Sequence, residues 1–248
     1  MKNYTSYDLI EWGKPFEKSQ HALPEPTLSE VLIRVTAAGL CHSDLHVQKG
    51  YMDLGEEGRL TFAERGAQLP MTFGHEIAGF VEAVGDKVKN VSIGQQVLVF
   101  PWIGCGDCLA CNENRESDCS AMRIIGLKQK GGFATHCLIE NEKFLVNIDG
   151  LDAAEVVPHA CSGITVYNAL EKIGFLRDGE WLAVMGCGGL GLNAIAIAGA
   201  MGFENVIGID IDNSKLDAAR EMGASITLNS KSANAVAELQ KYAESRLM

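Results

Sequence analysis

The chain has 248 residues, of which 47% are hydrophobic and 21% are charged, which is enough for one large domain or two modest ones. A formal net charge of −11 leaves no basic surface to neutralise phosphates, which argues against a nucleic-acid-binding protein. The sequence has no run of 18 apolar residues and no apolar signal segment at its N-terminus, so we expect neither a membrane span nor secretion. We therefore expect a cytoplasmic protein, in which closely spaced cysteines bind metal more often than they form disulfides.

The periodicity of apolar residues divides the chain into two regions. Up to about residue 150, short apolar runs are separated by Gly, Pro and Asp, which predicts a mostly antiparallel, barrel-like region. Its expected strands are Val31–Val35, Ile77–Val84, Gln96–Phe100 and Phe133–Leu138. From about residue 153 helices and strands alternate, which predicts parallel βαβ units. We therefore expect a β-rich domain over residues 1–152 and an α/β domain over residues 153–248.

The elements of the second region follow from its helical and strand-like spacings. The expected order is helix Ala153–Leu170, strand Glu180–Met185, helix Leu190–Ala200, strand Asn205–Ile209, helix Lys215–Glu221, strand Ser225–Leu228 and helix Ala233–Tyr242.

Four cysteines with the spacing C-x2-C-x2-C-x7-C form the plainest motif. They are Cys105, Cys108, Cys111 and Cys119. Zinc prefers soft ligands in a tetrahedron, and four thiolates leave no position open, so a zinc site of this kind is structural. Two other interpretations are four unrelated loop cysteines and an iron–sulfur cluster, which the same spacing could ligate.

A second candidate ligand set is distributed along the chain. Cys41 lies in GLCHSDLH, His75 in FGHE and Cys161 in PHACSG. Each residue alone is weak evidence, because a single buried cysteine or histidine usually belongs to a core. Two cysteines and one histidine nevertheless form the ligand set of a catalytic zinc with one open position.

Polar residues beside these candidates suit a metal site. Ser43 and His46 offer a hydroxyl and an imidazole that could pass a proton outward. Asp44 and Glu76 are acids that could orient ligands or modulate the metal, and we include Glu76 in the candidate metal group. The remaining cysteines, Cys137 and Cys187, are expected to be small apolar side chains in the core.

The segment VMGCGGLGLNA follows an expected strand and begins an expected helix. It satisfies the dinucleotide-binding pattern G-x-G-x-x-G with Gly186, Gly188 and Gly191. The candidate pyrophosphate-binding turn consists of Gly186, Gly188, Gly189, Leu190 and Gly191. Nineteen residues further on, Asp210 ends a strand, where a carboxylate can bind the ribose hydroxyls and would repel a 2′-phosphate. The expected cofactor is therefore NAD rather than NADP.

Together, in this order, GLCHSDLH, GHEIAGFVEAVG, the four-cysteine loop and CSGITVYNAL resemble the zinc-dependent medium-chain alcohol dehydrogenases, up to about residue 240. The resemblance implies a GroES-like barrel-type catalytic domain followed by a Rossmann doubly wound parallel sheet, here partial. It also implies two zinc ions per chain. Cys41, His75 and Cys161 would bind the catalytic ion, and the four-cysteine loop the structural one.

The resemblance further implies an oxidoreductase that interconverts an alcohol and its aldehyde or ketone with NAD. Ser43 and His46 would form the proton relay, and His42 would approach the cofactor pyrophosphate. Lys215 resembles the family's ribose-side lysine, although an exposed helix charge explains it equally well. Trp102 would line the substrate pocket, with core packing as the alternative. A full-length member of the family is expected to form a homo-oligomer.

The chain departs from the family in two places. Residues 51–70 form a longer stretch than in many relatives, and we expect a loop near the substrate entrance. Glu56, Glu57 and Glu64 in it could select a substrate charge, but a solvated loop is the commoner meaning of such residues. The chain also ends after the third strand–helix unit of the nucleotide-binding region, so we expect a truncated chain, or one whose sheet another chain completes.

Three competing hypotheses remain at this stage. A zinc-free enone reductase that uses NADPH is disfavoured by the three candidate zinc ligands and by Asp210. A truncated remnant that binds zinc without turnover is favoured by the early C-terminus. A cysteine-rich module that binds protein or nucleic acid leaves the glycine turn unexplained and does not fit the acidic charge.

Overall fold

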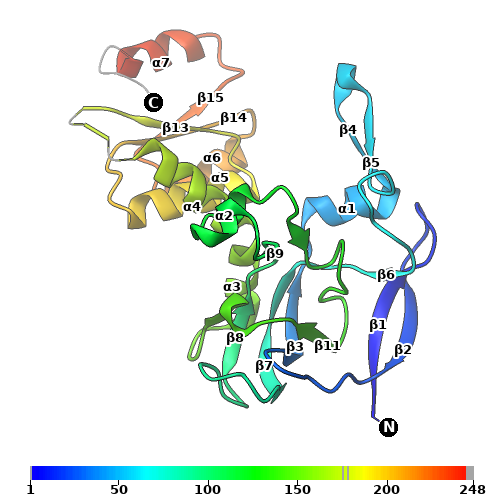
Figure 1. The fold of residues 1–248 in the computed structure, drawn as a ribbon. Coiled ribbons are helices and arrows are strands. Elements are labelled where there is room, and N and C mark those ends of the chain that lie inside the picture. The colour runs from blue at the N-terminus through cyan, green and yellow to red at the C-terminus, as the bar shows by residue number, and fades with distance from the viewer. Residues whose placement is uncertain (1, 175, 178, 244–248) are drawn as a thin grey trace. The chain divides into compact units, whose positions relative to one another are not determined.

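The computed structural model describes residues 2–174, 176–177 and 179–243 (Figure 1). The chain divides into two compact units, one up to Cys161 and one from Ser162 onward. Helix α3 and the 3-10 helix η4, which lie beyond residue 152, pack against strands β3 and β7 of the first unit. No helix in these ranges is long and apolar enough to cross a membrane.

The first unit is built on an antiparallel five-stranded sheet with the order β11-β3-β7-β8-β12. Its strands are β3 (Val31–Gly39), β7 (Glu76–Val84), β8 (Gln96–Val99), β11 (His136–Ile139) and β12 (Leu145–Asn147). The four strands predicted for this region all belong to it, although β11 begins at His136 rather than Phe133. The sequence pattern therefore located four of the five strands of the central sheet and missed β12.

Smaller elements surround this sheet. A three-stranded sheet has the order β2-β1-β6, and two short pairs are β4–β5 and β9–β10. These strands are β1 (Asn3–Leu9), β2 (Glu17–Ala22), β4 (Tyr51–Asp53), β5 (Arg59–Thr61), β6 (Met71–Thr72), β9 (Trp102–Ile103) and β10 (Arg123–Ile124). The helical elements of the unit are α1 (His42–Lys49), η1 (Gly55–Glu57), α2 (Leu109–Asn112), η2 (Glu116–Asp118), η3 (Glu142–Phe144), α3 (Ala153–Val156) and η4 (Val157–Ala160).

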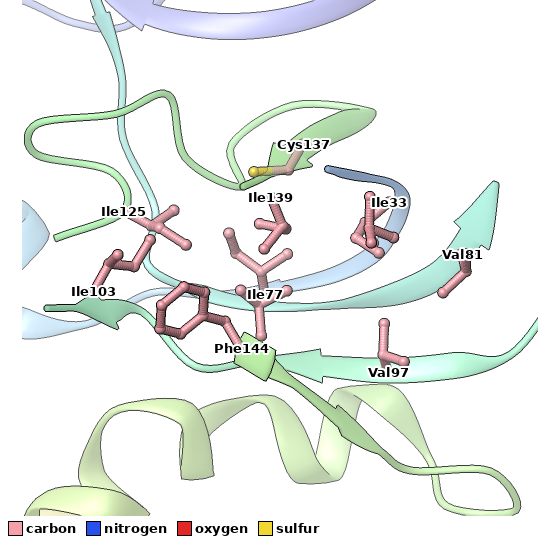
Figure 2. Close-up of a cluster of buried hydrophobic side chains, with 11 residues drawn as sticks. Ile33, Ile77, Val81, Val97, Ile103, Ile125, Cys137, Ile139 and Phe144 are labelled. Atoms are coloured by element: carbon pink, nitrogen blue, oxygen red, sulfur yellow. The ribbon is translucent and has the colours of Figure 1, made fainter. Parts of the chain in front are cut away.

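The core of the first unit follows from the two-residue period of its strands. Ile33 and Ile77 are fully buried, and Ile33 faces Val81 across the β3–β7 pair. Figure 2 shows these side chains among the strand ribbons with Ile139 and Phe144. Burying each such side chain contributes about 1.5–3 kcal/mol. This core holds the ends of β3 and β7 in place, and Cys41, His75 and Glu76 lie at or next to those ends.

The structure corrects the prediction of a loop over residues 51–70. The stretch contains the β4–β5 hairpin, seen in cyan in Figure 1, with η1 at its turn. The Arg59 guanidinium lies over the Tyr51 ring at 4.3 Å from its centroid, and such contacts stabilise a short hairpin. Glu56, Glu57 and Glu64 are exposed.

The second unit contains a parallel three-stranded sheet with the order β13-β14-β15. Its elements are α4 (Ser162–Ile173), β13 (Leu182–Met185), α5 (Gly189–Ala200), β14 (Val206–Asp210), α6 (Asn213–Glu221), β15 (Ile226–Asn229) and α7 (Ala235–Ala243). The expected alternation of strands and helices is confirmed. The prediction of one helix over Ala153–Leu170 is wrong, because the chain forms α3, η4 and α4 instead. Pro158 lacks the backbone N–H that a continuous helix would need there. Cys161 lies at the break before α4.

A buried carboxylate ties β1 to β6. Asp8 is 4% exposed, accepts a hydrogen bond from the Thr72 hydroxyl at 2.6 Å and lies 3.0 Å from His21 Nε2. Burial alone would raise the pKa of Asp8, but hydrogen bonds from Thr72 and His21 outweigh burial and lower it. The side chains of β1 that face inward are therefore partly polar, which explains why its apolar alternation was not recognisable.

We predict that Asp8→Asn lowers the free energy of unfolding by about 1–2 kcal/mol at neutral pH, because a charge-assisted hydrogen bond is lost. A lowered folded-state pKa stabilises the fold above the unfolded pKa of about 4, and this contribution disappears as the pH falls. The difference between wild type and variant should therefore shrink below about pH 4. Urea denaturation monitored by tryptophan fluorescence measures the free energy of unfolding of each protein. The control is Asp86→Asn, which changes an exposed aspartate. Equal loss in both variants would contradict the prediction.

Candidate metal centres and dinucleotide turn

Four side chains from three separate parts of the chain converge in the first unit. One ligand atom each from Cys41, His75, Glu76 and Cys161 lies within 4.8 Å of the others. The Sγ atoms of Cys41 and Cys161 are 3.9 Å apart. Two thiolates on one tetrahedral zinc are expected roughly 3.8 Å apart, given Zn–S bonds of about 2.3 Å. The geometry of the group therefore fits a single ion.

The ends of three elements place these ligands. Cys41 is the N-cap of α1 just after β3, and Glu76 begins β7 directly after His75. Gly39 pairs with Glu76 across the β3–β7 ladder, and a Cβ at Gly39 would overlap the Glu76 carboxylate. A glycine at that position is therefore required for Glu76 to point toward the group, a requirement that sequence analysis missed.

Asp44 holds two of the candidate ligands. Its Oδ2 accepts the backbone N–H of Cys41 at 2.9 Å, and its Oδ1 lies 3.5 Å from His75 Nδ1. The carboxylate is 4% exposed. A buried acid behind an imidazole fixes the ring's orientation and leaves its other nitrogen for a metal. The structure thus gives a definite position to an acid that the sequence could only suggest.

The electrostatics of the group favour the metal-binding form of Cys41. Hydrogen bonds from Cys161 and His75 lower the pKa of Cys41 to about 3, while burial opposes them. Burial would lower the pKa of His75, but the hydrogen bonds with Asp44 and Cys41 raise it to about 10. Burial and the Cys41 charge raise the pKa of Glu76 to about 7. The thiolate is the form in which cysteine binds metals.

The candidate relay residues lie on α1. Hydrogen bonds from Ser43 to Cys41 contribute to the lowered pKa of that thiol. The rings of His42 and His46 meet edge to face with centroids 5.0 Å apart. Within the described ranges no hydrogen bond joins Ser43 directly to His46. The structure therefore brings Ser43 to the ligand group and His46 to His42.

The four cysteines of the loop also form one compact group. Their Sγ atoms lie within 4.8 Å of one another. Cys111 Sγ lies 3.5 Å from Cys108 Sγ and 3.9 Å from Cys105 Sγ, and the Cys105 backbone N–H donates to Cys119 Sγ at 3.4 Å. Backbone N–H groups of Asp107 and Cys108 lower the pKa of Cys105 to about 6. The thiol geometry thus fits a second, closed tetrahedral site.

Trp102 lies in β9 and packs edge to face on Phe100 at 5.8 Å between ring centroids. Both rings line a cavity of about 360 Å³ together with Asn114, Ser117 and Phe144. Of the described residues that line it, none is a member of the Cys41 group. The contacts that the structure gives Trp102 are thus those of aromatic packing beside the cysteine loop.

The glycine turn joins β13 to α5 in the second unit. Gly186 has φ +91°, a conformation that favours glycine. A Cβ on Gly191 would overlap the Gly186 carbonyl oxygen, so the close approach of helix and turn requires glycine there. Gly188 is the N-cap, and Gly189 and Leu190 begin a helix of 12 residues. A helix N-terminus in this setting can bind an anionic pyrophosphate.

Asp210 ends β14 beside this turn and is 7% exposed. It accepts the Cys187 backbone N–H at 2.8 Å, the Ile211 N–H at 2.7 Å and the Asp212 N–H at 3.0 Å. These bonds, led by that of Cys187, lower the pKa of Asp210, and the charge of the exposed Lys215 also contributes. Asp210 therefore holds the glycine turn as well as presenting a negative charge.

A small cavity of about 180 Å³ adjoins Asp210. It is lined by Met185, Gly186, Ile209, Asp210, Ile211 and Ser230. Ile211 and Ser230 were not predicted. Ser230 could have been predicted from its position directly after β15. The carboxyl ends of neighbouring parallel strands meet at one edge of a sheet, which places Ser230 near Asp210.

Comparison with known proteins gives two family matches. Residues 27–150 match the family described as alcohol dehydrogenase GroES-like domain, and residues 189–247 match the family described as zinc-binding dehydrogenase. An NAD-dependent alcohol dehydrogenase of Sulfurisphaera tokodaii is 39% identical over 240 residues, which are 96% of this chain and 67% of that protein. One of Saccharolobus solfataricus is 37% identical, with the same coverage of both chains.

Solved structures show the same likeness. The alcohol dehydrogenase of Aeropyrum pernix superposes with a TM-score of 0.82 at 28% identity, covering 98% of this chain and 69% of that one. The D-arabinose dehydrogenase of Sulfolobus solfataricus superposes with a TM-score of 0.81 at 28% identity, covering 98% of this chain and 71% of that one. This chain thus spans about two thirds of the length of the proteins that it resembles. It belongs to the medium-chain, zinc-binding alcohol dehydrogenase family.

Proposed function

We propose that this chain provides the zinc-binding and adenosine-binding parts of an NAD-dependent dehydrogenase that interconverts an alcohol and its aldehyde or ketone. The observation that carries the proposal is the convergence of Cys41, His75 and Cys161, whose ligand atoms lie within 4.8 Å in a chain that also has the glycine turn. Relatives at 37–39% identity are NAD-dependent alcohol dehydrogenases, which supports the same reaction class.

The residues of the first unit have complementary roles in this proposal. Two thiolates and an imidazole would hold a catalytic zinc, and Glu76 lies where it could join them. A zinc ion in such a site supplies a Lewis acid that lowers the pKa of an alcohol. Asp44 orients His75, and the Ser43 hydroxyl beside Cys41 would accept the alcohol proton and pass it toward His46. The four-cysteine loop would hold the structural zinc.

The second unit would bind the adenosine and pyrophosphate of NAD. The turn leads directly into α5, whose first N–H groups lack partners within the helix and would bind the pyrophosphate. Asp210 would accept hydrogen bonds from the ribose hydroxyls. A buried carboxylate would repel the 2′-phosphate of NADP. His42 and Lys215 would approach the same cofactor.

For the catalytic site we predict that Cys41→Ser lowers the zinc content from two ions per chain to one and abolishes alcohol-dependent NAD reduction. The physical reason is the loss of a soft ligand from a site with three protein ligands. Elemental analysis of the purified protein measures zinc, independently of activity. Cys137→Ala, which removes a cysteine outside both groups, should keep two ions. Unchanged zinc content in Cys41→Ser would rule out the assignment.

For the loop we predict that Cys108→Ser removes the other zinc and lowers the melting temperature by roughly 6–12 °C, because the binding energy of a structural ion is folding energy. Thermal unfolding followed by circular dichroism measures the shift. Iron instead of zinc, with visible absorption of the wild-type protein, would show that the loop holds an iron–sulfur cluster and would contradict this part of the proposal.

For cofactor choice we predict that Asp210→Ala weakens NAD binding by about tenfold or more and shrinks the preference for NAD over NADP. Both the ribose contact and the support of the turn are lost. Titration calorimetry with each cofactor tests this, with the exposed Asp217→Ala as control. If the variant kept the wild-type preference, the carboxylate argument would be wrong.

A further inference from the structure

A cavity with both polar and apolar walls lies in the first unit, between β1, β2 and β11. Its volume is about 350 Å³, within the range of small-molecule sites. None of the candidate metal ligands lines it. The polar side chains that line it are Tyr4, His21, Gln129, Lys130 and His136. Three of these five are basic, in a chain whose net charge is −11.

Lys130 lies at the centre of this group. Its Nζ is 3.5 Å from the Tyr4 hydroxyl and 3.4 Å from His21 Nδ1. Among the residues that the structure describes, no carboxylate lies within ion-pair distance of this ammonium. Arg123, a neighbour of this region through Glu140, is by contrast paired with that carboxylate at 2.7 Å. Lys130 is exposed and has no direct ion pair among the described residues. Its contact with a carboxylate runs through His21 to Asp8, and its Nζ lies 5.9 Å from the Tyr4 ring centroid.

Two acids of this region lie behind the histidines, and a third, Glu140, accepts a hydrogen bond from Gln129 at 3.3 Å. His21 Nε2 is 3.0 Å from Asp8 Oδ2, and His136 Nε2 is 3.1 Å from Glu82 Oε2. Neither Asp8 nor Glu82 lines the cavity. Each imidazole is thus anchored from behind, and the cavity wall presents basic and hydroxyl groups.

Tyr4 adds a neutral hydrogen-bond donor. Its side chain is largely buried, and its ring lies beside those of His21 and His136 at 5.4 and 6.2 Å between centroids. Burial, with the nearby Asp8 and Cys137, raises the pKa of Tyr4 above its usual value. The phenol therefore remains protonated and can donate to an anion.

We propose that this cavity, which we name the Lys130 cavity, binds the phosphate group of a small molecule, either free phosphate or a phosphate monoester. Lys130 would supply the charge and Tyr4 a hydrogen bond. Lysine is a common point-charge ligand of phosphate, and a dianion would compensate the unpaired ammonium. The inference is independent of the proposed dehydrogenase activity, since it uses no residue of the metal or dinucleotide sites.

Calorimetric titration at constant ionic strength tests the proposal with inorganic phosphate and with glycerol 3-phosphate as probes. We expect Lys130→Gln to weaken binding about tenfold or more, and Lys130→Arg, which keeps the charge, to retain binding within about threefold. Lys128→Gln is the matched control, because it removes the same charge from an exposed lysine two residues away and should leave binding unchanged. Circular dichroism and zinc content establish that each variant is folded.

The two probes distinguish the sources of the anion. Tighter binding of glycerol 3-phosphate would identify a phosphate monoester as the ligand, and equal binding would identify the free anion. Phosphate that binds at the glycine turn is insensitive to Lys130, so the difference between variants isolates this cavity. No heat of binding up to about 20 mM probe, or equal weakening by Lys128→Gln and Lys130→Gln, would overturn the proposal.

Discussion

The candidate site depends on one geometric constraint, which is that two thiolates and an imidazole must reach a single point from three separate backbone segments. The Sγ atoms of Cys41 and Cys161 lie 3.9 Å apart although the residues are 120 positions apart in sequence. The packed β3–β7 pair fixes Cys41 and His75, and the break between η4 and α4 fixes Cys161. Because a few tenths of an ångström decide whether a tetrahedral ion fits, the rigid barrel core is part of the site.

Several single residues make more than one contact around these sites. Asp44 contacts both the backbone of Cys41 and the ring of His75, and Gly39 leaves room for Glu76. In the second unit, Asp210 accepts the Cys187 N–H and thereby couples the shape of the glycine turn to the charge beside it. Each of these residues supports both the local backbone and a ligand or a charge. Its substitution is therefore expected to affect both binding affinity and local structure.

Much of this arrangement was predictable, and the reasons for the failures are physical. Strongly apolar strands such as those containing Ile33 and Ile77 follow the two-residue period and were found. Strand β1 was missed because the polar residues Ser6 and Asp8 face inward and interrupt the alternation of apolar and polar residues. The ligand types could be assigned from the motifs, but the interruption of the helix at Pro158, the place of Gly39 and the contacts of Asp44 are properties of the folded chain.

X-ray absorption at the zinc edge of the purified protein tests the convergence of ligands most directly. Two sulfur ligands at one site and four at the other predict an average of three sulfurs per zinc, at about 2.3 Å, with two ions per chain. A single ion per chain surrounded by four sulfurs would contradict the account, because Cys41, His75 and Cys161 would then hold no metal.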